Sequence, residues 1–386
     1  METSKERTIV VLGASYGGFR AAQILAESLP PEWTLIVLER NSHMNHVYVF
    51  PRCALMAEYA PRAFIPYDNL FPALSPERCR AVLIHATVLG MTSHSVRFQR
   101  HGASETEKMD FTYAIYALGS GMPGPVNIWT SDHGLGNGST GTKRHGITWM
   151  EQQSQMFVNA RDVLIVGGGA LGIQFATDLK ELFPHKDVTL LHSRYRLLPK
   201  YPVAVHDMCV KRMADMGILT VFGQRVHTWP VNKPGRKKVQ TETGAVYEAD
   251  IVLCCTGQKP QIAILAAMSP LSINQETGRI AVLPTLQLAS PRGQLLSHIF
   301  AVGDCADTGA IQAGNTAYRQ AEVAAKNILG LVKGLQTGDV PELQNYHPGK
   351  PMIKLSLGIK TLMNATGEKI EVTENGKEDL DALSMW

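Results

Sequence analysis

The chain has 386 residues, of which 45% are hydrophobic and 18% charged, and its formal net charge is +3. This length allows two or three domains with cores of their own. The nearly balanced charge does not indicate nucleic-acid binding, and no apolar run approaches the roughly 18 residues of a spanning helix. The six cysteines contain no CxxC pair, and the polar first residues resemble neither a secretory nor a lipidation signal. We therefore expect a cytoplasmic, metal-free protein with no nucleic-acid partner and no stable membrane insertion.

The first segment has the pattern of a nucleotide-binding unit. Residues 8–12 are apolar and rich in β-branched side chains, which predicts a strand buried on both faces. This strand leads into a glycine turn at residues 13–18 and a helical pattern that ends before Pro30. A second buried strand, residues 34–38, ends at Glu39. The segment is therefore a complete strand–turn–helix–strand unit.

A second unit of the same kind begins at Asp162. It has a strand at residues 162–166, a glycine turn at 167–172, a helix through Phe183 and a strand at 188–191. The two units are too far apart for a solenoid repeat, so we predict an α/β fold with two Rossmann-like domains.

The remainder of the chain gives weaker signals. We expect a mobile surface loop at residues 131–146, buried strands at 251–257 and 299–304, and a helix at 317–332 that ends near Gly334. The tail from Gly349 is expected to be less regular, with its last dozen residues loosely held.

The glycine spacing indicates what the two turns bind. The first glycine allows the tight turn, the second lets the backbone approach a pyrophosphate, and the third lets helix and strand pack closely. The second turn satisfies G-x-G-x-x-G in full, whereas in the first turn Ser15 replaces the middle glycine. Either turn alone is weak evidence, but two in the correct context indicate two dinucleotides.

The residues after the second strand of each unit suggest different nucleotides. Glu39 can accept hydrogen bonds from both ribose hydroxyls of an adenosine without a 2′-phosphate. The equivalent place in the second unit reads His192-Ser193-Arg194 and has no acid, so Arg194 could pair with a 2′-phosphate. We therefore predict FAD in the first site and NADPH in the second, or NADH and NADPH without strong choice. The alternative for Arg194 is a solvated surface side chain.

Together with residues 256–260 (TGQKP) and 300–307 (FAVGDCAD), these turns resemble the flavoprotein reductases that have two dinucleotide-binding domains. The chain looks most like their apoptosis-inducing-factor-like branch, which includes ferroptosis suppressor protein and fungal relatives. Supporting matches are residues 45–46, 50–52, 63–67, 188–194, 346–349 and 355–358.

The resemblance implies a glutathione-reductase-like topology and an enzyme. An FAD-binding domain (1–125 and 281–340) would be interrupted by an NAD(P)-binding domain (147–280) and followed by a C-terminal segment (341–386). Hydride would pass from NADPH or NADH to the flavin, and electrons would then reach a quinone or aromatic small-molecule acceptor.

The resemblance also assigns site residues. The FAD-binding residues would be Gly13, Ala14, Ser15, Gly17, Gly18, Glu39, Arg40, Arg52, Val88 and Asp304. The residues that bind NAD(P) would be Gly167, Gly169, Gly172 and Arg194. Asp304 would hydrogen-bond the ribitol, although a helix N-cap is the alternative. His46 and Arg52 would line the substrate side of the flavin, and a satisfied core or surface position is the alternative for His46.

Three departures from the family pattern leave other functions open. Gln174 stands where many relatives have a glutamate that reaches toward the reacting rings, and the usual Ala-Thr-Gly is Ala117-Leu118-Gly119. The redox-active cysteine pair of the disulfide reductases is absent, and Cys305 beside Asp304 is either a packing residue or a reactive thiol. Gln174 favours a second reading, a tailoring oxidase or redox-neutral catalyst on a small metabolite with a vestigial NAD(P) domain. A third reading is a redox-gated signalling or binding flavoprotein.

Overall fold

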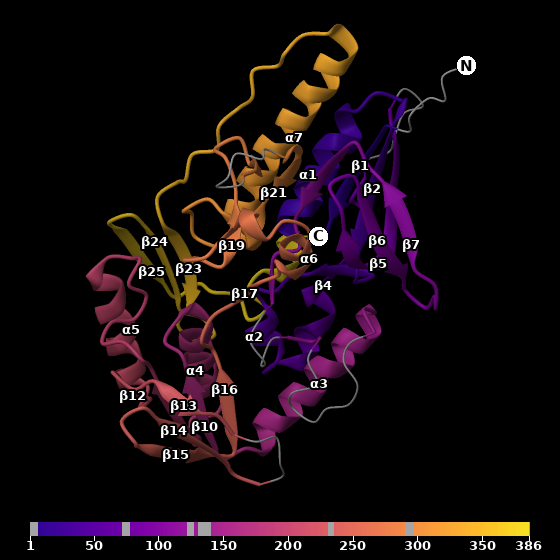
Figure 1. Cartoon of the computed structure of the whole chain (residues 1–386). Coiled ribbons are helices and arrows are strands. Elements are labelled where there is room, and N and C mark those ends of the chain that lie inside the picture. Colours follow the sequence, from indigo (N-terminus) through magenta and orange to yellow (C-terminus); the bar gives the residue numbers. More distant parts are fainter. Residues whose placement is uncertain are drawn as a thin grey trace. The chain divides into compact units, whose positions relative to one another are not determined.

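The computed structural model describes residues 7–71, 78–121, 127–129, 140–230, 235–289 and 296–385. The chain divides into two compact units. Unit 1 comprises residues 1–44, 66–121 and 259–349, and unit 2 comprises residues 45–65, 122–258 and 350–386. Each unit is built on a largely parallel sheet, so the predicted α/β fold with two Rossmann-like units is confirmed (Figure 1).

Unit 1 is built on an eight-stranded sheet. Its strands are β1 (Arg7–Leu12), β2 (Trp33–Glu39), β5 (Arg80–Met91), β6 (Ser95–Arg100), β7 (Glu107–Asp110), β8 (Tyr113–Tyr116), β20 (Gln287–Leu288) and β21 (Leu296–Ala301). They lie in the order β20-β21-β8-β1-β2-β5-β6-β7. The neighbours from β21 to β5 pair in parallel, and antiparallel strands complete both edges. The carboxyl ends of the parallel strands therefore share one edge of the sheet.

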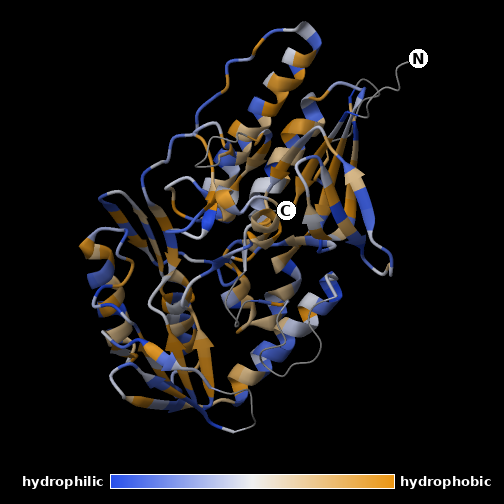
Figure 2. Ribbon diagram, viewed as in Figure 1, coloured by the Kyte–Doolittle hydropathy of each residue, from blue (hydrophilic) through white to orange (hydrophobic). Residues whose placement is uncertain are grey.

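Helices cover both faces of this sheet. On one face α1 (Tyr16–Ser28) and α7 (Gly314–Thr337) lie side by side and share a core with β1 (Figure 1). The other face packs against α6 (Ala263–Met268). Because β1 is buried on both faces from Ile9 to Leu12, it is among the strands coloured as hydrophobic in Figure 2. The helix α7 continues past the predicted end at Gly334, because its left-handed cap is Gly338 (φ 81°).

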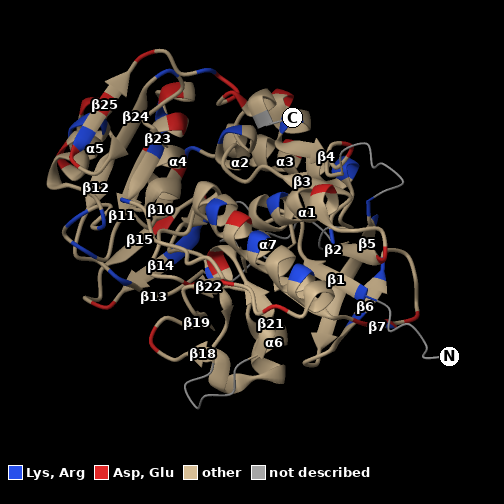
Figure 3. Cartoon of the chain, turned by 90° about the horizontal axis from the view of Figure 1, so that it is seen from above, with Lys and Arg blue, Asp and Glu red and all other residues tan. Residues whose placement is uncertain are grey.

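Short elements complete unit 1. They are β9 (Ser120–Gly121), β17 (Lys259–Pro260), β18 (Ile273–Asn274), β19 (Arg279–Ala281), β22 (Ala306–Asp307) and the 3₁₀ turns η3 (Pro270–Ser272) and η4 (Gly303–Cys305). The charged residues of α7 are three basic residues and one acid, Arg319, Glu322, Lys326 and Lys333, and Figure 3 shows the acid between basic positions.

Unit 2 is built on a parallel four-stranded sheet. Its strands are β10 (Asp162–Val166), β11 (Asp187–Leu191), β12 (Leu219–Val221) and β16 (Ile251–Cys254), in the order β12-β11-β10-β16. An antiparallel sheet consists of β13 (Val226–Thr228), β14 (Lys237–Thr241) and β15 (Val246–Ala249). The helical elements are α2 (Phe50–Cys53), η1 (Ala57–Ala63), α3 (Lys143–Asn159), α4 (Ala170–Leu182) and α5 (Val203–Asp215). Where the chain passes between the units it forms the short strands β3 (His43–Asn45) and β4 (Phe64–Pro66).

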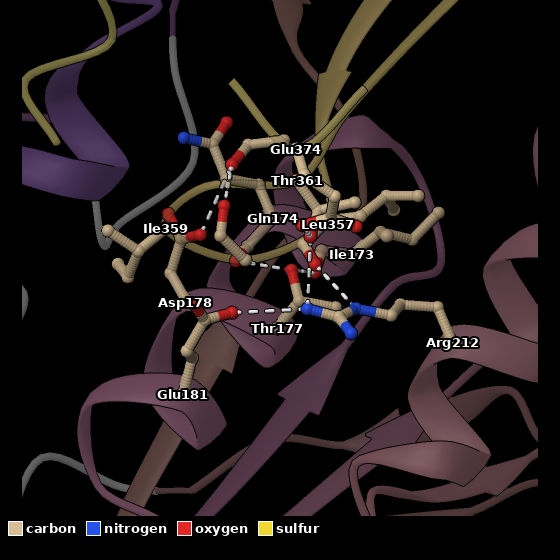
Figure 4. Close-up of polar contacts among 12 residues, drawn as sticks. Ile173, Gln174, Thr177, Asp178, Glu181, Arg212, Leu357, Ile359, Thr361 and Glu374 are labelled. Carbon is tan, nitrogen blue, oxygen red and sulfur yellow. Dashed lines mark hydrogen bonds and ion pairs between the residues drawn. The ribbon is translucent and has the colours of Figure 1, made fainter. Parts of the chain in front are cut away.

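The C-terminal segment is more regular than predicted. It forms an antiparallel sheet of β23 (Met352–Ser356), β24 (Leu362–Thr366) and β25 (Lys369–Thr373), followed by the 3₁₀ turn η5 (Ala382–Met385). Side chains from the helices of unit 2 hold this segment. Arg212 of α5 donates to the carbonyl oxygen of Leu357 (3.0 Å) and to the hydroxyl of Thr361 (3.1 Å), which in turn donates to Glu374 (Figure 4). The segment is therefore ordered by long-range bonds that its own sequence does not reveal.

The two compact units have other bounds than the predicted domains. Residues 259–280 pack with unit 1, because β17 pairs with β9 and α6 packs on β5. Residues 45–65 pack with unit 2, where η1 contacts α3. Most of the C-terminal segment also belongs to unit 2, and its beginning, up to Gly349, belongs to unit 1.

Two other predictions concern loops and membranes. Most of the expected loop at residues 131–146 lies outside the described residues, and its last part is not a loop, because α3 begins at Lys143 with Thr142 as its N-cap.

Within the described part of the chain, no helix combines the length and the apolar character that crossing a membrane would require.

Candidate functional site

The first glycine turn joins β1 to α1 and has the geometry that the spacing predicts. Gly13 has φ 91°, and a Cβ on Gly18 would lie 1.8 Å from the carbonyl oxygen of Gly13. Only glycine therefore fits the two outer positions. Ser15, at the middle position, is the N-cap of α1 but its side chain makes no capping bond. Its hydroxyl can therefore turn to an anion in front of the helix N-terminus.

Glu39 holds this turn from the end of β2. Its Oε2 accepts the backbone N–H of Ala14 (2.7 Å), and its Oε1 accepts the backbone N–H of Asn41 (2.8 Å). The carboxylate is buried. Gly17, the remaining predicted residue of the turn, packs against Val302 and α7. The structure thus brings the predicted turn residues and Glu39 together at the carboxyl edge of β1 and β2.

Asp304 lies at the same edge of the unit 1 sheet, just beyond β21. Its Oδ2 accepts a hydrogen bond from the hydroxyl of Ser120 (2.8 Å). Burial raises the pKa of Asp304, and the Ser120 hydroxyl and Arg279 oppose that shift. It belongs to η4, and the N-cap of α7 is Ala313, so Asp304 does not cap that helix.

Sequence reasoning missed Gln320, which fixes the loop that carries Asp304. Gln320 projects from α7 and is only 1% exposed. Its Oε1 accepts the backbone N–H of Gly303 (2.7 Å), and its Nε2 donates to the hydroxyl of Thr308 (2.9 Å). A recess beside it is lined by Gly303, Asp304, Thr308, Ala313, Thr316 and Gln320. The sequence signal was a polar residue on the buried face of α7, between Ala317 and Ala321.

The second glycine turn joins β10 to α4 and repeats the first. Gly167 has φ 124°, and a Cβ on Gly172 would lie 1.9 Å from the carbonyl oxygen of Gly167. A Cβ on Gly169 would meet no atom within 4 Å among the described residues. The middle position therefore leaves space where a phosphate group can approach the backbone.

Arg194 lies just beyond β11 and is exposed. Its guanidinium makes no hydrogen bond or ion pair with the residues that the structure describes, and only its carbonyl oxygen has a partner, the backbone N–H of Gly223. This placement is compatible with both predictions, a nucleotide contact and a solvated side chain.

Gln174 lies in the first turn of α4, where Figure 4 shows it on the same helix as Asp178. Its backbone carbonyl accepts a hydrogen bond from Thr177 (3.2 Å). Its Nε2 is buried, and the side chain lies beside the Asp178 carboxylate, whose pKa it lowers against the larger, opposite effect of burial.

Arg52 has different partners from those predicted. It is fully buried in unit 2, where its guanidinium forms a bidentate ion pair with Asp178 of α4 (2.9 and 3.1 Å). It also donates to the hydroxyl of Ser356 (2.8 Å) and to the carbonyl oxygen of Glu378 (2.7 Å). A flavin could reach this side chain only if these bonds were broken, so the structure assigns Arg52 to the attachment of the C-terminal segment.

His46 also belongs to unit 2 and is 7% exposed. Burial lowers its pKa from 6.5 to about 4. The imidazole is therefore neutral at pH 7 and does not carry the proton that a general acid needs.

The last two predicted FAD residues lie in unit 1. Arg40 follows Glu39, and its carbonyl oxygen lies 2.9 Å from Nε2 of His85. Val88 is half-buried in β5 and packs on the core that faces α6. Neither placement tests a contact with the nucleotide.

The cysteines are free thiols, and five of the six are buried. Burial raises the pKa of Cys305 to about 12, so the thiol beside Asp304 is not activated and its packing role is the better supported one. Cys255 is buried and Cys254 is half-exposed, as expected for adjacent residues that point to opposite faces of a strand.

These arrangements fit two dinucleotides. In unit 1, Ser15, Glu39 and Asp304 place a hydroxyl and two carboxylates at one sheet edge, together with the N-termini of α1 and α7. In unit 2, the open position at Gly169 lies at the N-terminus of α4. The donors suit a polyol, a ribose and pyrophosphate groups.

Comparison with known proteins agrees with this geometry. Residues 7–326 match the pyridine nucleotide-disulphide oxidoreductase family. The chain is 38% identical to Fe-regulated protein 8 of Mycosarcoma maydis, over all of this chain and 96% of that protein. It is 26% identical to human ferroptosis suppressor protein 1, over 91% of this chain and 86% of that protein. The fold is shared with the water-forming NADH oxidase of Lactobacillus brevis bound to NADH, with a TM-score of 0.65 at 20% identity, covering 94% of this chain and 76% of that one.

The family match spans most of the chain, and the similarity to the ferroptosis suppressor protein confirms the branch that the sequence resembles. Members and structural neighbours bind FAD and NADH or NADPH. The chain therefore belongs to the pyridine nucleotide-disulphide oxidoreductase family, in its apoptosis-inducing-factor-like branch, and is an FAD-dependent NAD(P)H oxidoreductase.

Proposed function

We propose that this enzyme oxidises NADPH or NADH, bound at the second glycine turn, and reduces a quinone or another aromatic small molecule. The observation that carries the proposal is the pair of glycine turns, each at the carboxyl edge of its own parallel sheet, with Glu39 after one β-strand and no acid after the other. FAD, when bound, supplies the electron-transfer chemistry.

The residues of unit 1 are suited to hold FAD. The turn at Gly13 leaves the backbone close to a pyrophosphate. Glu39 accepts three hydrogen bonds, from the N–H of Ala14 and from the backbone and side-chain amides of Asn41, and its Oε2 retains a lone pair for a ribose hydroxyl. Asp304 can accept from a ribitol hydroxyl while Ser120 orients it. Ala313 and Thr316, at the N-terminus of α7, line the recess beside Asp304, where the positive end of the helix dipole would stabilise negative charge.

The cysteines support a direct electron acceptor. A disulfide reductase relays electrons through an exposed, low-pKa thiol, whereas burial keeps the pKa of Cys305 at about 12. Without such a relay the acceptor itself must meet the flavin. A planar aromatic molecule such as a quinone can do so by stacking.

The test uses the purified flavoprotein under anaerobic conditions. NADPH or NADH should bleach the visible absorbance of the bound FAD, and a water-soluble quinone should restore it within the mixing time. Oxidised glutathione should restore it far more slowly. Equal recovery with glutathione disulfide, or recovery only with oxygen, would contradict a quinone acceptor.

Gln174 favours a second candidate, a tailoring oxidase or redox-neutral catalyst acting on a small metabolite. An amide cannot serve as a base or carry the charge of the usual glutamate. Under this alternative neither nicotinamide nucleotide bleaches the flavin, although FAD still binds. The same anaerobic titration therefore separates the two functions.

A further inference from the structure

Tyr67 ends segment 63–67, one of the segments in which the chain resembles its family, and it lies in unit 1 just after β4. Its hydroxyl donates a hydrogen bond to the carbonyl oxygen of Ala14 (3.1 Å), inside the first glycine turn. The two residues are 53 positions apart, so the glycine pattern of the turn does not reveal this bond. Tyr67 therefore supports the turn from outside the strand–turn–helix unit.

The segment that carries Tyr67 is packed on α1. The ring of Tyr67 stacks on Phe19, with centroids 6.4 Å apart and planes at 27°. Its backbone carbonyl accepts the N–H of Leu70 (2.9 Å), whose side chain is buried in the core that contains α1. Gln23 of α1 donates to the carbonyl oxygen of Asn69 (3.3 Å). These contacts hold the ring, so its hydroxyl meets the turn in a fixed position.

The hydroxyl of Tyr67 remains a donor over the whole range in which the protein works. Burial raises the pKa of Tyr67 well above its ordinary value, and the charge of Glu39 adds to that shift. The acceptor residue, Ala14, is fully buried, so its carbonyl oxygen needs a donor from the protein. Loss of the hydroxyl would leave that oxygen without this donor.

The two hydrogen bonds of Ala14 fix two successive peptide groups. Its N–H, in the peptide after Gly13, donates to Glu39 (2.7 Å). Its carbonyl oxygen, in the peptide before Ser15, accepts from Tyr67. Because this second peptide is trans, the N–H of Ser15 points away from Tyr67, and it makes no hydrogen bond with a residue that the structure describes. A donor of fixed direction therefore lies at the N-terminus of α1, where an anion is favoured.

We propose that Tyr67 is a positioning residue for FAD: it holds the peptide between Ala14 and Ser15 so that the N–H of Ser15 can donate to the pyrophosphate. A peptide in a tight turn can take either of two opposite orientations, as in type I and type II turns. The bond from Tyr67 selects one of them before the ligand arrives, which lowers the cost of binding. This inference rests on the part of the proposed function that places FAD at the first turn, and it is independent of the electron acceptor.

The test measures how well ADP and adenosine displace FAD from the full-length flavoprotein. Released FAD is followed by the rise in its fluorescence. The ratio of the two half-displacement concentrations gives the contribution of the pyrophosphate, whatever the affinity for FAD itself. We expect ADP to be the stronger competitor in the wild type. In Tyr67→Phe, which keeps the ring and removes only the hydroxyl, this advantage should fall roughly tenfold, because a hydrogen bond to a charged group is lost.

Tyr116→Phe is the matched control. The hydroxyl of Tyr116 also donates to a backbone carbonyl in unit 1, that of Gln261 (2.7 Å), which is not part of the turn. Both variants lose one such bond and should lose stability, but only Tyr67→Phe should change the advantage of ADP over adenosine. A merely structural role for Tyr67 would weaken the two competitors alike and leave their ratio as in the wild type.

The outcomes separate the inference from the proposed function. If adenosine competes as well as ADP in the wild type, the turn does not bind the pyrophosphate, and the placement of FAD fails together with the inference. If ADP is the better competitor and its advantage is unchanged in Tyr67→Phe, only the role of Tyr67 is overturned. Should Tyr67→Phe not fold, Ser15→Pro removes the same N–H at a φ of −81°, close to that of proline. The advantage of ADP should then fall, and an unchanged advantage would contradict the inference.

Discussion

Burial sets the protonation state of several titratable side chains in this protein. His46 and His192 are both kept neutral, one in the segment before α2 and the other behind the second glycine turn. Cys305, which follows Asp304, is kept as a thiol. At this scale the chain offers structural partners for cofactors rather than proton donors, which agrees with chemistry that the cofactors themselves perform.

The depressed pKa of His46 predicts a loss of stability in acid. Its pKa is about 4 in the folded protein and 6.5 in the unfolded chain, so between these values the unfolded state binds the extra proton. The stabilising contribution is complete above pH 6.5 and is lost as the pH falls to 4, by about 3 kcal/mol in total. Urea denaturation at several pH values should show this slope in the wild type and a shallower one in His46→Gln. The same change at the exposed His347 is the control, and an identical slope in all three proteins would contradict the assignment.

At the scale of elements, one ion pair connects α2, α4 and the C-terminal segment. Arg52 and Asp178 are both fully buried, so removing one partner leaves the other charge uncompensated. We expect Arg52→Met to lower the free energy of unfolding by about 3–5 kcal/mol, with Arg52→Met/Asp178→Leu recovering part of that loss. The more exposed pair Arg62–Asp379 holds the same segment and is the control, and Arg62→Met should cost about 1 kcal/mol or less.

Two measurements check this prediction. Urea denaturation gives the free energies, and tryptic cleavage after Lys377 reports release of the segment, because Arg52 donates to the carbonyl oxygens of Lys377 and Glu378. Early cleavage in Arg52→Met but not in Arg62→Met is the expected result. Equal cleavage in both variants would mean that the buried pair does not anchor the segment.

The elements that could be predicted are those that local sequence determines. The units β1–α1–β2 and β10–α4–β11 follow from buried apolar runs and glycine turns, and the structure places them within a few residues of the prediction. The sheet β23–β25 could not be predicted in the same way, because half its positions are exposed and Arg52 and Arg212 hold it from distant segments. The hydrogen bond that Nδ1 of His192 accepts from the backbone N–H of Gly168 could not be predicted for the same reason, because the two residues lie 24 positions apart.

For the whole molecule, bound FAD should contribute to global stability. The residues suited to hold it come from the ends of β1, β2 and β21 and from β9, which meet only when unit 1 is folded. A ligand that binds only the folded state raises the free energy of unfolding by about 2.7 kcal/mol at a concentration one hundred times its Kd. The melting temperature of the apoprotein should therefore rise steadily with the logarithm of the FAD concentration.

The stabilisation should also depend on which part of the ligand is present. ADP should give part of the effect of FAD, because Glu39 and the turn at Gly13 would contact the adenosine and pyrophosphate, and riboflavin, which lacks them, should give less than FAD. In Gly18→Ala, the added Cβ would meet the carbonyl oxygen of Gly13 at 1.8 Å and distort the turn. That variant should lose the response to ADP as well as to FAD. If riboflavin and FAD raised the melting temperature equally, the turn at Gly13 would not bind the adenosine and pyrophosphate part of FAD.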